Sequence, residues 1–204
     1  MALMVLDPAM ERQLKAEREA SGLDRYDETW EGVYMMAPLA NTEHQRLQSR
    51  LAAALQIAIG WDAPVQVLAG ANVSDREDDW TFNYRIPDVV VAHPGGAVRD
   101  CGTHRCGGPD FCVEITSPGD LSRDKLDFYS AIGVRELLLI DRDPWSLELY
   151  RLNAGRLALV GRSDLDKTET LVSTVVPVSF RLLPGTGRPA IDVTHRDAAQ
   201  HWLV

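Results

Sequence analysis

Two carboxylates and a lysine in the middle of the chain have the residue types and spacing best suited to chemistry. Asp88 lies in the run Ile-Pro-Asp-Val-Val-Val and Glu114 in the run Phe-Cys-Val-Glu-Ile-Thr, and both runs are typical of buried strands. A charge in such a run is costly unless it is paired or bound to a metal. The two acids therefore predict a divalent-metal site on neighbouring strands, and Lys125, which follows them closely, predicts phosphate chemistry.

Side-chain alternation explains how Glu114 could reach a metal ion. Residues 111, 113 and 115 face one side of the predicted strand, and Glu114 faces the other. If Asp88 is on an adjacent strand, the two carboxylates can share one Mg²⁺ (or Mn²⁺), with the backbone carbonyl of Ile115 as a further ligand. Such an ion activates water, orients a phosphate and neutralises charge during phosphodiester hydrolysis. Asp88, Glu114 and Lys125 are therefore the candidate catalytic residues.

The position of Lys125 follows from the helix that is predicted after the Glu114 strand. Lys125 falls in the first turns of this helix, and helical side chains lean toward the N-terminus of their helix. The lysine is therefore expected to lean back toward the carboxylates, where it would stabilise charge on the phosphate.

Hydrophobic periodicity predicts the elements around these residues. An amphipathic helix is predicted from Glu43 to Ile59, with Thr42 and Gln45 at the spacing of a capping box and Gly60 at its end. Strands are predicted at 65–69, 84–92, 111–116 and 136–141, and a second helix at 121–132 behind a cap at Asp120. The order is helix, three strands, helix and strand, and 111–141 has the pattern of a βαβ unit.

The rest of the chain is predicted to be rich in strands. A turn at Gly32 joins two short strands, and Pro87 indicates an edge position or a bulge within 84–92. We therefore predict an α/β (α+β) fold with extra C-terminal β-strands, built as a single domain over 26–204 after a polar, weakly anchored helical segment over 1–25. A loop is predicted at 93–110, and C-terminal strands at 146–152, 156–160 and 170–183.

Composition limits the classes of protein to consider. The net charge of −9 counts against a protein that coats nucleic acid non-specifically, although it allows a local basic cleft. No run of apolar residues is long enough to span a membrane, and the first residues do not resemble a signal peptide. The three cysteines form no even disulfide set, so a cytoplasmic location is the simplest expectation.

Several segments, taken together and in order, resemble a known family. Pro87-Asp88 followed by Glu114-Ile115-Thr116 resembles the PD-(D/E)XK motif of restriction-endonuclease-like nucleases, and the whole arrangement most resembles the Uma family of endonucleases within that superfamily. In the parent motif the lysine lies two residues after the acid, where this chain has Thr116, whereas Lys125 matches the Uma-like pattern. The further segments that carry the resemblance are 28–32, His44, 86–89, 113–118, Asp124 and Lys125 with Tyr129, 133–136 and 140–141.

The resemblance implies a function and further site residues. It implies a restriction-endonuclease-like core and an Mg²⁺-dependent endonuclease that acts on DNA, with a homodimer as one arrangement for cutting both strands. It also implies substrate or metal contacts for Glu28 and His44, although a histidine in the first turn of a helix is equally often a solvated or capping residue.

Alternative interpretations stay open at this stage. Thr116 at the motif position and the acidic balance also fit a catalytically silent binding or regulatory module with a nuclease fold, and the 1–25 segment could hold an accessory protein to a partner. Tyr129, one turn after Lys125, is expected to serve core packing. A zinc site at Cys101, Cys106 and Cys112 is disfavoured because the spacing is irregular and Cys112 lies in a strand.

Overall fold

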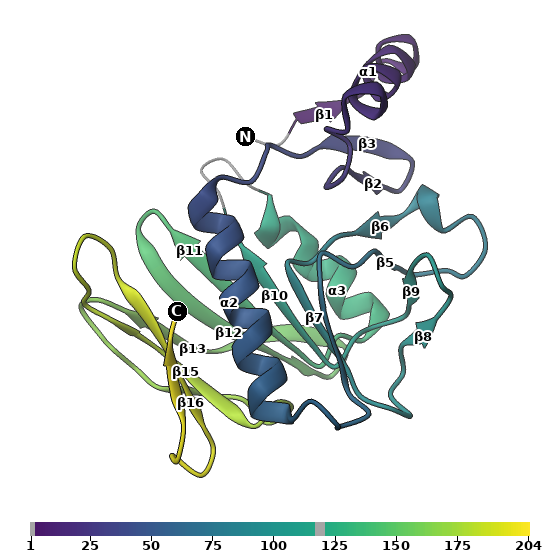
Figure 1. The fold of residues 1–204 in the computed structure, drawn as a ribbon. Helices are drawn as coiled ribbons and strands as arrows, with labels where there is room; N and C mark the ends of the chain where they lie inside the picture. Colours follow the sequence, from purple (N-terminus) through teal and green to yellow (C-terminus); the bar gives the residue numbers. More distant parts are fainter. Residues whose placement is uncertain (1–2, 117–120) are drawn as a thin grey trace.

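A six-stranded mixed sheet between two helices forms the centre of the computed structural model, which describes residues 3–116 and 121–204 (Figure 1). The helices are α2 (Thr42–Ile59) and α3 (Leu126–Ile132), the latter preceded by the 3₁₀ turn η2 (Ser122–Lys125). Across the sheet the strands are β13 (Arg156–Asp164), β12 (Trp145–Asn153), β11 (Glu136–Arg142), β10 (Phe111–Ile115), β7 (Val89–Ala92) and β4 (Gln66–Ala69).

The order of elements along the chain confirms the predicted core. After α2 come the strands β4, β7 and β10, then α3, then β11. Strands β10 and β11 pair in parallel around α3, as a βαβ unit requires, while the other neighbouring strands of this sheet pair antiparallel. The mixed α+β architecture and the predicted core of helix, three strands, helix and strand are therefore present.

The two faces of the sheet pack against different elements, and this places Glu114. Phe111, Val113 and Ile115 join the core that includes the apolar face of α2, whereas Cys112 joins the core that includes Tyr129 of α3. This alternation along β10 agrees with the predicted one. Glu114 therefore points to the α3 side of the sheet.

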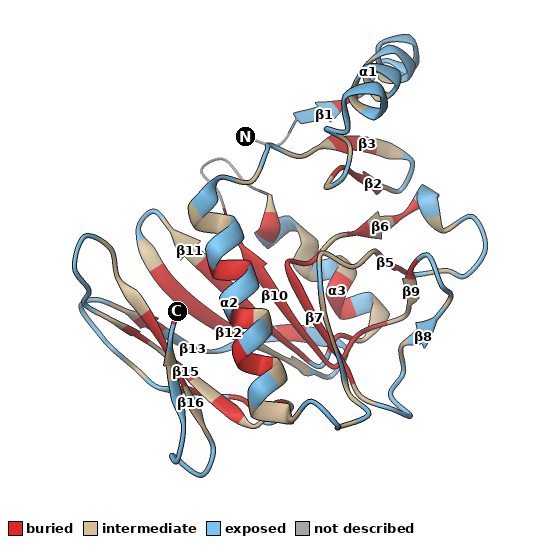
Figure 2. Ribbon diagram, in the orientation of Figure 1, coloured by how far each residue is buried: buried red, intermediate tan, exposed pale blue. Residues whose placement is uncertain are grey.

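A second sheet of short strands carries the N-terminal part of the chain. Its hairpin between β2 and β3 turns at Glu31 and Gly32, with φ of 48° and 83°, which confirms the predicted turn. The helix α1 (Pro8–Ser21) lies at one end of this sheet and has no buried residue (Figure 2). In order, its strands are β1 (Leu3–Val5), β3 (Val33–Met36), β2 (Glu28–Trp30), β6 (Tyr84–Arg85), β5 (Val73–Ser74), β9 (Arg105–Cys106) and β8 (Arg99–Asp100).

A third sheet packs its apolar face into the core beneath α2. Phe180 on β15 stacks on Phe111 of β10 with ring centroids 5.8 Å apart, and both side chains are fully buried. The predicted C-terminal strands are thus present, together with two strands that the sequence did not indicate. The sheet consists of β14 (Leu171–Val172), β15 (Val178–Leu183), β16 (Ala190–His195) and β17 (His201–Leu203).

The prediction of one continuous strand over 84–92 is wrong. The chain leaves the second sheet after β6 and enters the central sheet at β7, so that Pro87 and Asp88 lie in the break between the two strands. Because Pro87 has no backbone N–H to donate to a ladder, a break between two sheets suits it. The predicted loop 93–110 likewise contains the short pair β8 and β9.

Two predicted helix starts also differ from the structure. The side chain of Asn41, and not that of Thr42, caps α2 by accepting a hydrogen bond of 2.9 Å from the backbone N–H of His44. The predicted helix 121–132 begins as a 3₁₀ turn and becomes α-helical only at Leu126. The predicted cap, Asp120, lies outside the described residues. Within the described residues, no helix has the length and apolar character needed to cross a membrane.

Candidate active site

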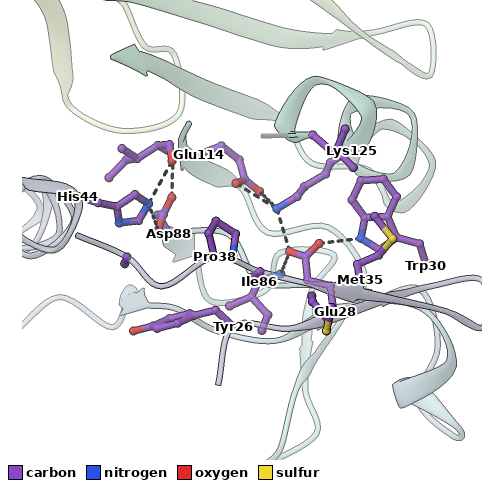
Figure 3. A pocket seen from close by; sticks show the side chains of 15 residues that line it. Tyr26, Glu28, Trp30, Met35, Pro38, His44, Ile86, Asp88, Glu114 and Lys125 are labelled. Carbon is purple, nitrogen blue, oxygen red and sulfur yellow. Dashed lines mark hydrogen bonds and ion pairs between the residues drawn. The ribbon is translucent and has the colours of Figure 1, made fainter. Parts of the chain in front are cut away.

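The central sheet and the second sheet meet at a pocket that contains every candidate residue. The pocket has a volume of about 720 Å³, its open mouth included. His44, Asp88, Glu114 and Lys125 lie along one side of it, and Glu28 reaches Lys125 from the second sheet (Figure 3). The predicted residues among its lining are Glu28, His44, Asp88, Glu114, Ile115 and Lys125.

Asp88 is fixed in the break between β6 and β7 by contacts with two other elements. Its Oδ2 accepts a hydrogen bond of 2.7 Å from the backbone N–H of Ile115 on β10. Its backbone carbonyl accepts a bond of 2.9 Å from Nε2 of Gln48 on α2. The carboxylate is thereby held beside the end of β10, with Oδ1 facing His44.

His44 lies between two oxygens that were predicted to bind metal. Its Nε2 is 3.3 Å from Oδ1 of Asp88 and 3.1 Å from the carbonyl oxygen of Ile115. When Nε2 carries a proton, it can donate to either oxygen. Within the described part of the chain, the buried Nδ1 atom of His44 has no hydrogen-bond partner.

Glu114 and Glu28 share the ammonium group of Lys125. Nζ of Lys125 lies 2.8 Å from Oε1 of Glu28 and 3.2 Å from Oε1 of Glu114, and Figure 3 shows the lysine reaching between the two carboxylates. The hydroxyl of Tyr129 on α3 donates a hydrogen bond of 2.5 Å to the same Glu114 oxygen. The lysine thus leans back to the carboxylates, in the direction that the sequence indicated.

Glu28 is held in the pocket by its own sheet. Its Oε1 accepts a bond of 2.8 Å from the backbone N–H of Ile86, and its Oε2 accepts one of 2.7 Å from Nε1 of Trp30. The Trp30 ring lies against the guanidinium of Arg85, which is 4.3 Å from the ring centroid. Arg85 also stacks on Phe128 at 4.3 Å, so a buried cation supports this wall of the pocket.

Burial and charge set the protonation of the acidic groups. Burial raises the pKa of Glu114 to about 8, Lys125 lowers it, and the nearby carboxylates of Asp88 and Glu28 raise it. Burial raises the pKa of Tyr129 well above its usual value of 10, so its hydroxyl remains a donor to Glu114 at neutral pH. In the absence of a bound cation, Glu114 therefore holds a proton over much of the neutral pH range.

The contacts of His44 can be compared with the spacing between ligands of a small divalent cation. Two adjacent ligands of an octahedral ion at about 2.1 Å are separated by about 3 Å. The separations of His44 Nε2 from Asp88 Oδ1 and from the Ile115 carbonyl, 3.3 and 3.1 Å, are close to that value. Within residues 3–116 and 121–204, no group of three or more His, Cys, Asp or Glu side chains is arranged to hold a metal. Such an ion would therefore need the Ile115 carbonyl as well.

Two residues with contacts to this site were not identified as functional from the sequence. Tyr129 is fully buried as expected for a packing residue, yet its hydroxyl contacts Glu114. Gln48 lies on the buried side of α2, where an amide is unusual and could have signalled a specific partner. Within the described residues the cysteines show no zinc cluster, and Cys112 is buried in β10.

Comparison with known proteins adds a family and a fold. Residues 18–184 match the family model Uma2, described as "Putative restriction endonuclease". A solved structure of "a putative nuclease belonging to DUF820" from Anabaena variabilis matches with a TM-score of 0.56 and 17% sequence identity, covering 72% of this chain and 80% of that chain. At this identity the likeness shows the fold alone. No curated protein matches the chain.

Proposed function

The chain belongs to the Uma2 family, and from this premise we propose that it is a divalent-metal-dependent endonuclease that hydrolyses phosphodiester bonds of DNA. The observation that carries the proposal is the convergence of Asp88, Glu114 and Lys125 in one pocket. They come from a break between sheets, a central strand and a 3₁₀ turn. A purely structural ion pair would not need to line an open pocket.

The carboxylates and one backbone carbonyl would hold the cation. Asp88, Glu114 and the carbonyl of Ile115 offer the hard oxygen ligands that Mg²⁺ and Mn²⁺ prefer, and His44 could add a nitrogen ligand. When bound, the ion would polarise the phosphate and lower the pKa of the attacking water. The backbone N–H of Ile115 keeps Asp88 facing that position.

Lys125, held by its two carboxylate partners, would stabilise the negative charge that develops on the phosphate. The ammonium group can donate to a non-bridging phosphate oxygen while Glu28 continues to hold it. Glu114 can exchange the Lys125 contact for the cation, since both present positive charge to the same carboxylate. Cutting both strands of a duplex would need two such pockets, which a homodimer would supply. The unpaired state of the three cysteines suits the cytoplasmic location expected from the sequence.

A plasmid-nicking assay tests this proposal. The purified protein should nick supercoiled plasmid with Mg²⁺ or Mn²⁺ and not with EDTA, and Asp88→Ala should lower the rate at least about a hundredfold. Asp62→Ala is a matched control, since Asp62 is exposed outside the pocket. Thermal melting should show that both variants are folded. Nicking in EDTA, or a fully active Asp88→Ala protein, would contradict the proposal.

One observation favours a second function, a binding module without turnover. Thr116 stands where the parent motif has its lysine, and its hydroxyl donates to Asp141, not to the carboxylates of the pocket. Isothermal calorimetry with Mg²⁺ and Mn²⁺ at millimolar concentration separates the two functions. A folded protein that binds neither ion would favour the binding module, whereas binding that Asp88→Ala abolishes would favour the nuclease.

A further inference from the structure

The wall of the pocket that faces Asp88 and Glu114 is apolar and partly aromatic. Tyr26, Met35, Pro38 and Ile86 lie on this side (Figure 3), and Met36 also lines the pocket. These residues belong to the second sheet or to the segments next to its strands. The second sheet therefore supplies the apolar side chains of the pocket, and it also supplies Glu28, which contacts Lys125.

This apolar wall has a consequence for the nucleotide beside the scissile phosphate. If a phosphate lies between Asp88 and Lys125, its neighbouring sugar and base can reach the apolar side chains that line the same pocket. A base within a duplex is stacked on its neighbours and cannot reach such a wall. An unpaired base presents a flat apolar face, which stacks on aromatic and apolar side chains.

The charge of the pocket also disfavours a continuous duplex. The carboxylates of Glu28 and Glu114 contact the ammonium of Lys125, and Asp88 adds a third carboxylate to the lining of the pocket. Tight duplex binding depends on several Lys or Arg contacts to successive phosphates. Stacking of an unpaired base requires fewer of these contacts, which suits a chain with a net charge of −9.

We propose that the apolar wall binds the unpaired base next to the scissile phosphate, so that the substrate is single-stranded or locally opened DNA. This inference rests on the proposed nuclease function and names its substrate class.

Tyr26 is the residue of this wall that best tests stacking. Its side chain is half-buried and its ring edge packs near Gly70, where an added Cβ would lie 3.4 Å from Cε1 of Tyr26. The ring is thus positioned by the body of the protein while it lines the pocket. Loss of one such stacking contact typically weakens binding of a single strand by about tenfold or more.

Fluorescence anisotropy with labelled DNA measures binding without cleavage. A fluorescein-labelled twelve-nucleotide thymidine oligomer and a blunt duplex of equal length would be titrated in EDTA with the full chain. Single-strand binding should be at least about tenfold tighter than duplex binding, fall about tenfold in Tyr26→Ala, and return in Tyr26→Phe. Trp61→Ala is the control, because Trp61 is 75% exposed and does not line the pocket. Thermal melting checks that each variant is folded.

Cleavage of matched substrates completes the test. The same phosphodiester bond, placed in a single strand, in a three-nucleotide bulge and in a continuous duplex, should be cut fastest where its neighbour is unpaired. Equal cleavage of all three, unchanged in Tyr26→Ala, would overturn the inference and leave the nuclease standing. Tyr26-dependent binding of the single strand without any cleavage would support the pocket and refute the nuclease. Equal binding of both DNAs by the wild type and Tyr26→Ala would overturn the inference whatever is cut.

Discussion

The ammonium group of Lys125 lies closer to Glu28 than to Glu114. Nζ is 2.8 Å from the Glu28 carboxylate and 3.2 Å from the nearer Glu114 oxygen. Glu28 is itself fixed by the backbone N–H of Ile86 and by the indole N–H of Trp30. The position of the lysine therefore depends on β2 of the second sheet as much as on β10 of the central sheet.

The first prediction concerns this contact. Glu28→Gln keeps the size of the side chain and removes its charge, so Lys125 should shift toward Glu114 and compete with the cation there. We expect kcat for plasmid nicking to fall about tenfold or more, the effect of one charged hydrogen bond, with a smaller change in KM. Glu31→Gln, an exposed acid three residues along the same hairpin, should leave the rate unchanged. A wild-type rate in Glu28→Gln would show that Glu114 alone positions the lysine.

The second prediction concerns the hydroxyl of Tyr129. Because this hydroxyl donates to Glu114 and lowers the pKa of that carboxyl, Tyr129→Phe should raise the pKa further. The rising limb of the pH–rate profile should move to higher pH, while the rate on its plateau changes little. Tyr150→Phe is the matched control, since the Tyr150 hydroxyl donates to Glu148 outside the pocket. An unchanged pH–rate profile in Tyr129→Phe would show that the Tyr129 hydroxyl does not control the pKa of Glu114.

The third prediction follows from the pKa of about 8 at Glu114. Below that pH a divalent cation must displace a proton, so its apparent affinity should rise about tenfold for each pH unit up to about 8 and then level off. The increase in Tm on adding Mg²⁺ should therefore be larger at pH 9 than at pH 6.5. Calorimetry in buffers of different ionisation enthalpy should detect about one proton released per ion at pH 7. An Mg²⁺ affinity independent of pH would contradict this.

The same carboxyl should also affect the stability of the metal-free protein. Cation affinity is expected to rise with pH, whereas this stability is expected to fall with pH. The folded-state pKa of Glu114 lies above its usual value of 4.5, so the folded state binds more protons between these limits. The stability gained from the protonated group is present below about pH 4.5 and is lost as the pH rises through about 8. Glu114→Gln should therefore flatten the decline of Tm between pH 6 and 9 in EDTA. If Tm declines equally steeply in Glu114→Gln, the decline is caused by other titratable groups.

The fourth prediction concerns the attachment of α1. Arg18 pairs with the buried carboxylate of Asp27 at 2.5 Å, and Asp27 also accepts hydrogen bonds from the hydroxyl of Tyr34 and the backbone N–H of Ala37. Arg18→Ala leaves this charge without its cation, so the free energy of unfolding should fall by about 3 kcal/mol in urea denaturation. Arg12→Ala, on the same helix, should change it by less than about 0.5 kcal/mol. Equal effects would mean that α1 is held by its strand β1 alone.

The fifth prediction separates the three thiols. Burial raises the pKa of Cys112 well above its usual value of 9, whereas Cys101 and Cys106 are partly exposed. A thiol reagent should therefore label two cysteines in the native protein and the third only after unfolding, as peptide mass spectrometry can assign. Rapid native labelling of Cys112 would show that β10 opens more readily than its packing indicates.

The parts of the fold that could be predicted are those whose pattern is local. The heptad-like apolar face of α2 and the apolar runs of β10 and β11 carry their own periodicity, so their elements were found within a residue or two. Strands of two or three residues, such as β5, β8 and β9, have no room for a period. They exist because other segments pair with them: β5 pairs with β6 and, across about 30 residues, with β9, and β9 in turn pairs with β8.

The candidate site could be predicted in its residue types and only partly in its geometry. The acids within apolar strands could be identified from the sequence, because such charges are costly without partners. Pro87 indicated an irregularity in the strand, but the sequence could not show that the chain passes from one sheet into another at Asp88, because a strand-like run looks the same in both cases. The contact of Lys125 with Glu28 joins residues 97 positions apart, which no local pattern can show.

The chain passes from one sheet to another between Arg85 and Val89, and the residues of the pocket are likewise shared between these two sheets. Asp88, Glu114 and the carbonyl of Ile115 are anchored on the central sheet, whereas Tyr26 is attached to the neighbouring one. A change in the second sheet would therefore alter the apolar wall directly and, through Glu28, the position of Lys125, while Asp88 would keep its hydrogen bond to β10.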